Sequence, residues 1–239
     1  MLTFIEMLQV AIDNGASDVF IVAGQPLSYK KGRKIHSWVT WYVDSSDGGK
    51  SWSEPRELIP GDTYCGRGPV KNKCIRTKDG LLLAPASNEK TRQLWRCYID
   101  VSRDDGDTWE KCDYIVRPKK NFGLAGMIQP TLWQDDEGVV HAFMRSNKGR
   151  IYRSESLDGG VTWSKAERTD LPNNNSGIDI ARTDDGKLFL ISNPVKENWG
   201  ERTPLTVICS DDNGKTWGLG AVLESMPGEY SYPAIIADG

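Results

Sequence analysis

The octapeptide SSDGGKSW at residues 45–52 returns three more times along the chain. The copies are SRDDGDTW at 102–109, SLDGGVTW at 156–163 and SDDNGKTW at 210–217. All four fit the pattern S-x-D-x-G-x-[ST]-W, and the steps from one aspartate to the next are 57, 54 and 54 residues. Self-similarity at a fixed period of this length indicates a repeat architecture.

Each octapeptide has the chemistry of a hairpin turn. The aspartate carboxylate can accept backbone N–H bonds within the turn, and the glycine adopts a positive φ without a Cβ penalty. The tryptophan then enters the next strand and is expected to pack beneath it. We therefore expect the four aspartates to be structural; they are Asp47, Asp104, Asp158 and Asp212.

Short apolar or alternating runs fill the rest of each period. Runs such as WVTWYV (38–43), LWRCYIDV (94–101) and LTVIC (205–209) precede the octapeptides, and turn-strand signals such as TKDGLLLA (77–84) and RTDDGKLFLI (182–191) lie between them. A period of about 55 residues thus holds about four short strands, as in one blade of a β-propeller. The nine tryptophans and 24 glycines among 239 residues also favour an all-β fold rich in turns.

Composition excludes several classes of function. A net charge of −3 argues against a nucleic-acid partner, and no apolar run is long enough to span a membrane. Five cysteines without a CxxC pair and only two histidines give no basis for a metal site, a cofactor or a Ser-His nucleophile. The N-terminus lacks a basic leader, so we expect a cytoplasmic protein as the sequence is written.

The octapeptide resembles the Asp-box, or bacterial neuraminidase repeat, of the sialidase superfamily. The resemblance covers residues 36–239 and extends to segments such as RGPVKNK (67–73), IQPTLW (128–133) and EYSYPAII (229–236). It implies a six-bladed β-propeller, of which this length provides about four blades. We therefore expect an incomplete ring. The Asp-box also occurs in propellers without catalytic activity, where it lies away from the active face.

Residues 1–35 show a different pattern. FIEMLQVAIDNG (4–15) has a helical apolar stripe, and DVFIVAG (18–24) has the pattern of a strand. This short α/β segment is similar to the N-terminal edge of type IV pilus retraction and secretion ATPases, although no Walker lysine loop occurs anywhere in the chain. The explanations are a natural fusion or a chimeric gene model, and we favour the second.

The resemblance to sialidases implies a set of catalytic and binding residues. Members of that family hold the substrate carboxylate with three arginines, use a tyrosine paired with a glutamate as nucleophile, and use an aspartate as general acid and base. Arg202 matches an arginine of this set, and Tyr230 matches the nucleophile, with Tyr232 as its alternate. The glutamate position holds Arg182, so Glu229 or Asp179 would have to replace it.

Polar residues at the starts of inner strands, or just after them, supply further candidates for substrate binding. In a propeller these positions face the central axis, where they would form a cationic pocket for an anionic sugar. The alternative for each residue is a solvated or salt-bridged surface group. The candidates are Arg67, Glu89, Gln129 and Arg145, together with Lys71.

These features predict a sialidase-like glycoside hydrolase that acts on a terminal acidic sugar. The alternative is a non-catalytic propeller that binds glycans or proteins, and a third possibility is a fragment with neither activity. The sequence leaves the sugar, the linkage and the oligomeric state open.

Overall fold

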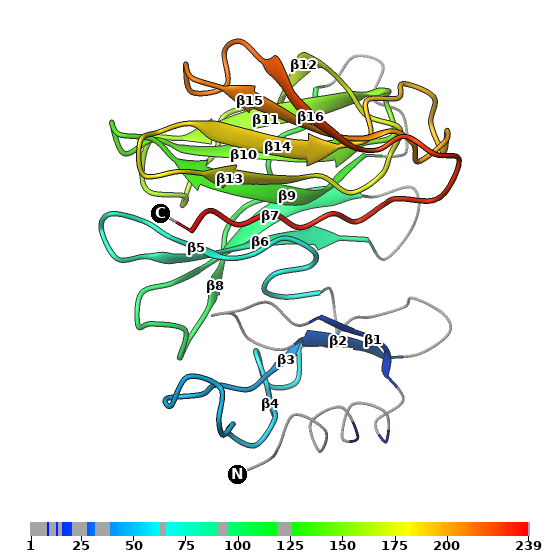
Figure 1. The fold of residues 1–239 in the computed structure, drawn as a ribbon. Coiled ribbons are helices and arrows are strands. Elements are labelled where there is room, and N and C mark those ends of the chain that lie inside the picture. Colours follow the sequence, from blue (N-terminus) through cyan, green and yellow to red (C-terminus); the bar gives the residue numbers. More distant parts are fainter. Residues whose placement is uncertain are drawn as a thin grey trace.

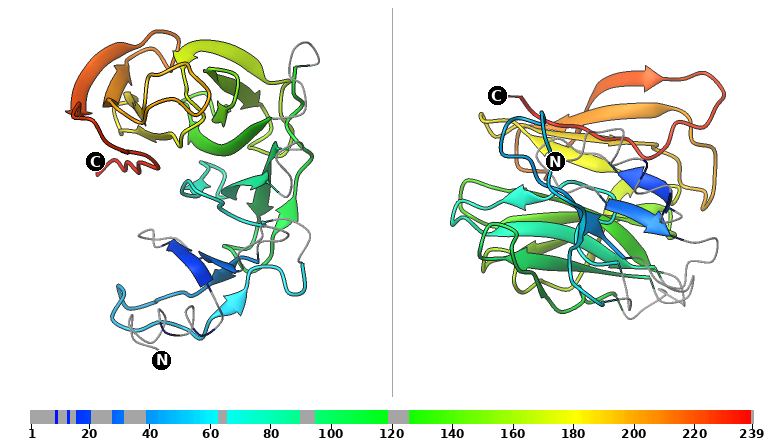
Figure 2. Two further views of the ribbon diagram at one scale, coloured as in Figure 1. Left: turned by 90° about the vertical axis from the view of Figure 1, so that its right-hand side faces the viewer. Right: turned by 90° about the horizontal axis from the view of Figure 1, so that it is seen from below.

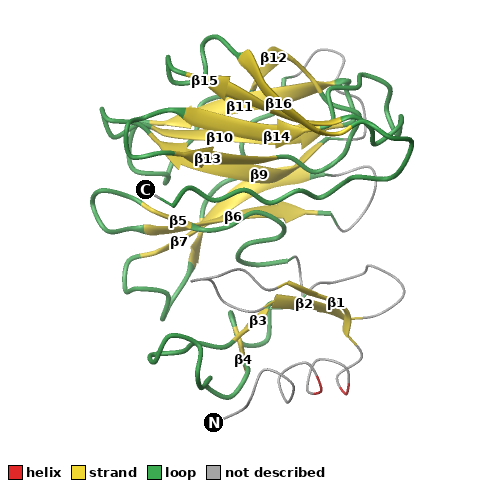
Figure 3. Ribbon diagram, viewed as in Figure 1, coloured by secondary structure: helices red, strands yellow, loops and turns green. Residues whose placement is uncertain are grey.

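The structure is a computed structural model that describes residues 9, 13, 16–20, 28–31, 39–62, 66–89, 95–118 and 126–238. Its strands form antiparallel sheets that follow one another along the chain (Figure 1). The sheets lie in an open arc, and the segment after the last strand turns back along the inner side of that arc (Figure 2). Strands and loops make up nearly all of the described chain (Figure 3), which confirms the all-β prediction.

Three sheets contain four strands each, in chain order. Sheet I consists of β5 (Ile75–Arg76), β6 (Leu82–Asn88), β7 (Arg96–Ser102) and β8 (Glu110–Lys111). Sheet II consists of β9 (Met127–Gln134), β10 (Val140–Ser146), β11 (Arg150–Ser156) and β12 (Glu167–Pro172). Sheet III consists of β13 (Asp179–Arg182), β14 (Leu188–Ser192), β15 (Leu205–Ser210) and β16 (Gly218–Glu224). The expectation of four short strands per repeat is confirmed for these three sheets.

Two smaller hairpins precede sheet I. In one, β1 (Ala16–Phe20) pairs with β2 (Ser28–Lys31), and in the other β3 (Trp41–Tyr42) pairs with β4 (Arg56–Glu57). β2 lies beside β3 (Figure 1). The strand predicted at 18–24 overlaps β1, whereas the helix predicted at 4–15 falls almost wholly outside the described residues. Within the described ranges, no helix is long and apolar enough to cross a membrane.

The octapeptides form the predicted turns. In the copy between β11 and β12, Asp158 Oδ1 accepts hydrogen bonds from Thr162 N at 2.8 Å and Ser156 Oγ at 2.7 Å. Ser156 Oγ in turn accepts from Gly160 N at 2.8 Å, and Trp163 Nε1 donates to Gly160 O at 2.9 Å. The turns around Asp104 and Asp212 repeat these bonds. The octapeptide aspartates are therefore engaged within their own turns.

The hydrophobic core lies between neighbouring sheets. Leu83 and Ile99 of sheet I share one buried cluster with Met127 and Met144 of sheet II. Trp133 and residues of sheets II and III form a second cluster. Three of the four octapeptide tryptophans pack in or against these and related clusters, as the sequence predicts; they are Trp109, Trp163 and Trp217.

The strand registers divide the molecule into two edges. Val140 of β10 pairs with Ser156, which begins an octapeptide, whereas Ser146 lies at the other end of β10 and pairs with Met127. Because the strands are antiparallel, the octapeptides lie along one edge of the sheets, which we call the octapeptide edge. The end of β10 and the starts of β9, β13 and β15 meet at the opposite edge, which we call the far edge.

Candidate functional site

Arg145 is the central group of the far edge. It lies one residue before the end of β10, and its side chain is almost fully buried, with 2% of the residue exposed. Its Nη1 donates to Gln129 Oε1 at 2.9 Å and its Nε donates to Asn175 Oδ1 at 3.2 Å. No carboxylate of a described residue lies within 4.0 Å of its guanidinium group. A buried charge is costly unless an opposite charge pairs with it, and here only neutral groups bond to the guanidinium group.

Gln129 is held rigidly beside Arg145. It is buried on β9 with a φ of 53°, a conformation that few non-glycine residues adopt. Its backbone N–H donates to Ser87 Oγ at 3.2 Å, and the Ser87 hydroxyl donates to Glu89 Oε1 at 2.7 Å. Glu89 therefore reaches the site through Ser87, and it orients Gln129 instead of touching Arg145.

A buried asparagine loop closes the other side of Arg145. Residues 173–176 between β12 and β13 are all fully buried. Asn175 has a φ of 65°, and its Nδ2 donates to Asn198 Oδ1 at 3.1 Å. Its Oδ1 is thereby directed at Arg145. The run of three asparagines in the sequence indicates a turn at this loop, whereas no feature of the sequence points to Asn198.

Tyr232 lies between two arginines. Its ring centroid is 5.6 Å from Cζ of Arg145 and 5.7 Å from Cζ of Arg202, and its hydroxyl is 3.4 Å from Nη1 of Arg145. Tyr232 has a φ of 56° and is half exposed. Arg202 Nη1 also lies 3.5 Å from Glu229 Oε1. We call Gln129, Arg145, Asn175, Arg202 and Tyr232 the arginine cluster.

Tyr230, the predicted nucleophile, lies at the border of the arginine cluster. Its backbone N–H donates to Arg202 O at 3.1 Å, and its carbonyl accepts from Asn193 Nδ2 at 3.0 Å. Its ring folds back toward Gly228, where an added Cβ would lie 3.0 Å from the tyrosine hydroxyl. Among the described residues, no hydrogen bond joins that hydroxyl to either arginine. Its role as nucleophile stays a prediction.

Asp179 is the other predicted catalytic carboxylate, and both of its carboxylate oxygens accept hydrogen bonds. Oδ1 accepts from Lys73 Nζ at 2.9 Å and Thr131 Oγ1 at 2.8 Å, and Oδ2 accepts from Ile235 N at 3.0 Å. The residue is buried, with 2% exposed. This arrangement joins sheet III to the loop before β5, to β9 and to the C-terminal segment, which is the arrangement of a structural carboxylate.

Lys71 supplies a second, partly buried cation near the arginine cluster. Its Nζ donates to Ile178 O at 2.8 Å and Pro233 O at 2.5 Å, and it packs with Tyr232 around Gly177. Burial lowers the pKa of Lys71 to about 8. The lysine therefore adds a positive charge at neutral pH that is lost under mildly alkaline conditions.

Arg67 lies apart from this cluster. It is buried in the loop before sheet I, where its guanidinium group bonds to Asp100 of β7 at 2.8 Å and to Asp62 at 3.0 Å. It also donates to Trp109 O. Because its charge is already compensated, Arg67 has the contacts of a structural ion pair. No group of metal-ligating side chains occurs among the described residues.

With this geometry established, comparison with known proteins decides the family. A model of the BNR repeat-like domain matches residues 20–239. The chain belongs to the BNR repeat-like family. The match begins sixteen residues before the domain boundary predicted at residue 36, and that boundary stays a prediction.

Relatives of this BNR repeat-like chain include two named sialidases. It is 26% identical over 202 residues to an anhydrosialidase of Macrobdella decora, covering 79% of this chain and 25% of that protein. It is 29% identical over 188 residues to a sialidase of Bacteroides fragilis, covering 72% of this chain and 32% of that protein. The chain thus spans between a quarter and a third of the length of these relatives.

Solved structures show the same fold. A Hadza microbial sialidase superposes with a TM-score of 0.66 at 19% identity, over 84% of this chain and 42% of that one. A protein of unknown function from Dyadobacter fermentans gives a TM-score of 0.63 at 16% identity, over 95% of this chain and 61% of that one. None of the relatives named here is an ATPase, and the resemblance of residues 1–35 to pilus ATPases stays a prediction.

Proposed function

We propose that this BNR repeat-like chain carries the sugar-binding face of a sialidase-like glycoside hydrolase that acts on a terminal acidic sugar. The observation that carries the proposal is the buried Arg145, whose hydrogen-bond partners are all neutral. The carboxylate of an acidic sugar would supply the missing negative charge. Arginine suits this task because its fork of N–H donors matches a carboxylate and stays charged at all relevant pH values.

The other members of the arginine cluster complete a sugar site. Arg202 approaches the Tyr232 ring at 5.7 Å, as Arg145 does at 5.6 Å, so two guanidinium groups border the same half-exposed surface. The amide of Gln129 can donate a hydrogen bond to a hydroxyl group, and Asn175 holds Arg145 in place. Lys71 adds positive potential at neutral pH. Such convergence of cations and amides is typical of a pocket for an anionic sugar.

A tyrosine beside the bound carboxylate would act as the nucleophile. A neutral phenol can approach an anionic sugar without repulsion between carboxylates. Its oxygen would bond to the anomeric carbon as the glycosidic bond breaks; the phenol proton would pass to a carboxylate such as Glu229, and the leaving oxygen would take a proton from an acid. Tyr230 is the sequence match for this role, whereas Tyr232 contacts the arginines.

The names of the relatives support the same class of substrate, since those proteins are an anhydrosialidase and a sialidase. We further propose that the three four-stranded sheets are consecutive blades of a six-bladed propeller. The octapeptides would be its Asp-boxes. They lie on the octapeptide edge, opposite the arginine cluster, and this placement fits a structural role for the Asp-boxes.

A second candidate is a propeller that binds acidic glycans without cleaving them. Two observations favour it. In the described part of the chain, no carboxylate bonds to the hydroxyl of Tyr230 or Tyr232, and the Glu229 side chain is 75% exposed. A phenol without a nearby base is a weak nucleophile.

Hydrolysis of 4-methylumbelliferyl sialoside by the full chain distinguishes the two candidates. The hydrolase proposal expects turnover that is abolished by Arg145→Ala and by either Tyr230→Phe or Tyr232→Phe, whichever residue is the nucleophile. Full activity in both tyrosine variants would contradict the assigned chemistry. Saturable binding of the sialoside without turnover would establish the binding propeller instead.

A further inference from the structure

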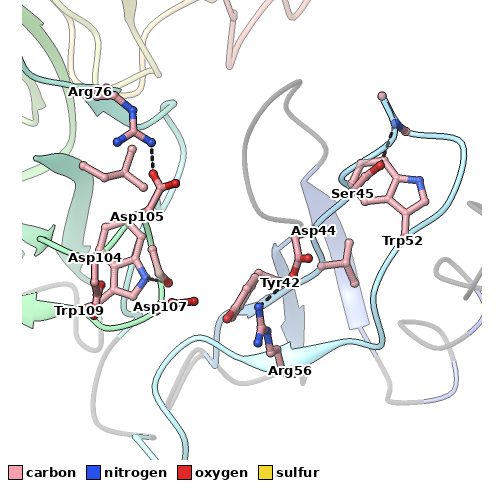
Figure 4. A pocket seen from close by; sticks show the side chains of 15 residues that line it. Tyr42, Asp44, Ser45, Trp52, Arg56, Arg76, Asp104, Asp105, Asp107 and Trp109 are labelled. Atoms are coloured by element: carbon pink, nitrogen blue, oxygen red, sulfur yellow. Dashed lines mark hydrogen bonds and ion pairs between the residues drawn. The ribbon is translucent and has the colours of Figure 1, made fainter. Parts of the chain in front are cut away.

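A large cavity lies on the octapeptide edge, away from the arginine cluster. Its volume is about 760 Å³, within the usual range for small-molecule sites. Figure 4 shows its two walls: one carries Tyr42 and Trp52 from the first octapeptide region, and the other carries Asp105 and Trp109 from the second. The cavity therefore lies between β3 and sheet I.

The corresponding position is more closely packed between the later sheets, where the cavity beside the fourth octapeptide has a smaller volume of about 530 Å³. A Cβ placed on Gly160 of the third octapeptide would lie 2.5 Å from Leu83 of sheet I. In the fourth octapeptide, Trp133 of sheet II donates to Asn213 Oδ1 at 2.8 Å. These contacts narrow the seam between sheets I and II and the seam between sheets II and III.

Gly106, the equivalent glycine of the second octapeptide, lacks such a neighbour from the preceding sheet. A Cβ placed there would meet Leu82 and Trp109 of its own sheet, at 3.7 and 3.8 Å, among the residues described. The wider cavity at this first seam therefore does not follow from the repeat alone, since the cavity beside the fourth octapeptide is smaller.

The walls of this cavity offer free hydrogen-bonding groups. The indole N–H of each later octapeptide tryptophan donates to a glycine carbonyl of its own turn at 2.9 to 3.1 Å. The half-buried Trp52 makes no such bond within the described chain. Asp107 is exposed, and its carboxylate is likewise without a hydrogen-bond partner among described residues. Both are available to a ligand.

The charges of the cavity favour a neutral ligand. Its carboxylates belong to Asp44, Asp104, Asp105 and Asp107, whereas its cations are Arg56 and Arg76. Arg56 bonds to Asp44 at 2.9 Å and covers the Tyr42 ring at 4.5 Å, and Arg76 is paired with Asp105. With both arginines already compensated, an anionic sugar would meet net negative charge.

We propose that this cavity is a second binding site, which takes an uncharged pyranose sugar. The half-buried indole of Trp52 suits the C–H face of a sugar ring, and the exposed Asp107 carboxylate and the Trp52 N–H suit its hydroxyls. The site is separate from the arginine cluster in position and in ligand charge. It does not depend on the proposed hydrolase activity, because it concerns a neutral sugar at the other edge of the sheets.

Lactose is the probe, measured by saturation-transfer NMR and calorimetry on the full chain. Asp107→Phe places a bulky group at the mouth of the cavity from an exposed position, and Trp52→Phe removes the free N–H but keeps an aromatic ring. The matched control is Lys215→Phe, which introduces the same side chain at the exposed, equivalent position of the fourth octapeptide, beside the smaller cavity.

We expect saturable lactose binding that Asp107→Phe weakens about tenfold or more and Trp52→Phe weakens several-fold, as the loss of a hydrogen bond does. Lys215→Phe should bind lactose as the wild type does, and sialic acid binding should be the same in all variants. Three results would overturn the proposal. They are no binding of lactose, the same lactose affinity in Asp107→Phe as in the wild type, and binding of spermidine instead of lactose.

Discussion

The guanidinium group of Arg145 donates to Gln129 Oε1 at 2.9 Å, so a neutral amide occupies the place where a buried arginine would ordinarily meet a carboxylate. This relationship keeps the full positive charge of Arg145 available. Because the guanidinium group is buried away from bulk water, that charge attracts an anion more strongly than a surface arginine would.

Gln129→Glu tests this directly. The new carboxylate would form a buried ion pair with Arg145, and we expect the affinity for sialic acid to fall about tenfold or more, since charged hydrogen bonds contribute more than neutral ones. Calorimetric titration measures the change. Gln134→Glu adds the same charge at the other end of β9 and serves as the control; an equal loss in that variant would indicate a general effect of charge.

Lys71 should make anion binding dependent on pH. Its pKa is lowered to about 8 by burial, so the lysine is charged below pH 8 and neutral above it. Sialic acid affinity should therefore be highest below pH 8 and decrease as the pH rises through that value. Lys71→Arg keeps the charge at alkaline pH and should remove the decrease. A wild-type affinity that is constant from pH 7 to 9 would contradict this role.

Asp179→Asn should destabilise the fold. The substitution leaves Lys73 without its buried partner, and breaking such a pair costs about 3 kcal/mol. Urea unfolding followed by tryptophan fluorescence measures the free energy. The exposed Asp184 lies five residues away, and Asp184→Asn is the control. If Asp179 is structural, the additional change Lys73→Met should recover part of the loss; no loss of stability in Asp179→Asn would show that the carboxylate is kept for another role.

The turns and sheets could be predicted because their interactions are local. The bonds of Asp158 reach only from Ser156 to Thr162, so eight letters of sequence contain the whole turn. Four such turns at nearly equal spacing then define the repeat, and a repeat of this length fixes the number of strands in each sheet. The tryptophans could be assigned to the core for the same reason.

The arginine cluster could be predicted only in part. Arg145 and Gln129 were found as polar residues in apolar strands, but their pairing depends on the register of β9 and β10. Tyr232 has a positive φ, a backbone conformation that a tyrosine in the sequence does not indicate. The sequence alone could therefore not decide between Tyr230 and Tyr232. The ion pair of Asp179 could not be predicted either, because its partner Lys73 lies 106 residues away in the chain.

We propose above that Arg145 binds the carboxylate of an acidic sugar. Calorimetric titration of the full chain with N-acetylneuraminic acid and with its uncharged methyl ester tests it most directly. We expect the acid to bind, the ester to bind at least about tenfold more weakly, and Arg145→Ala to remove the difference. Equal affinity for acid and ester, or an unchanged preference for the acid in Arg145→Ala, would contradict it.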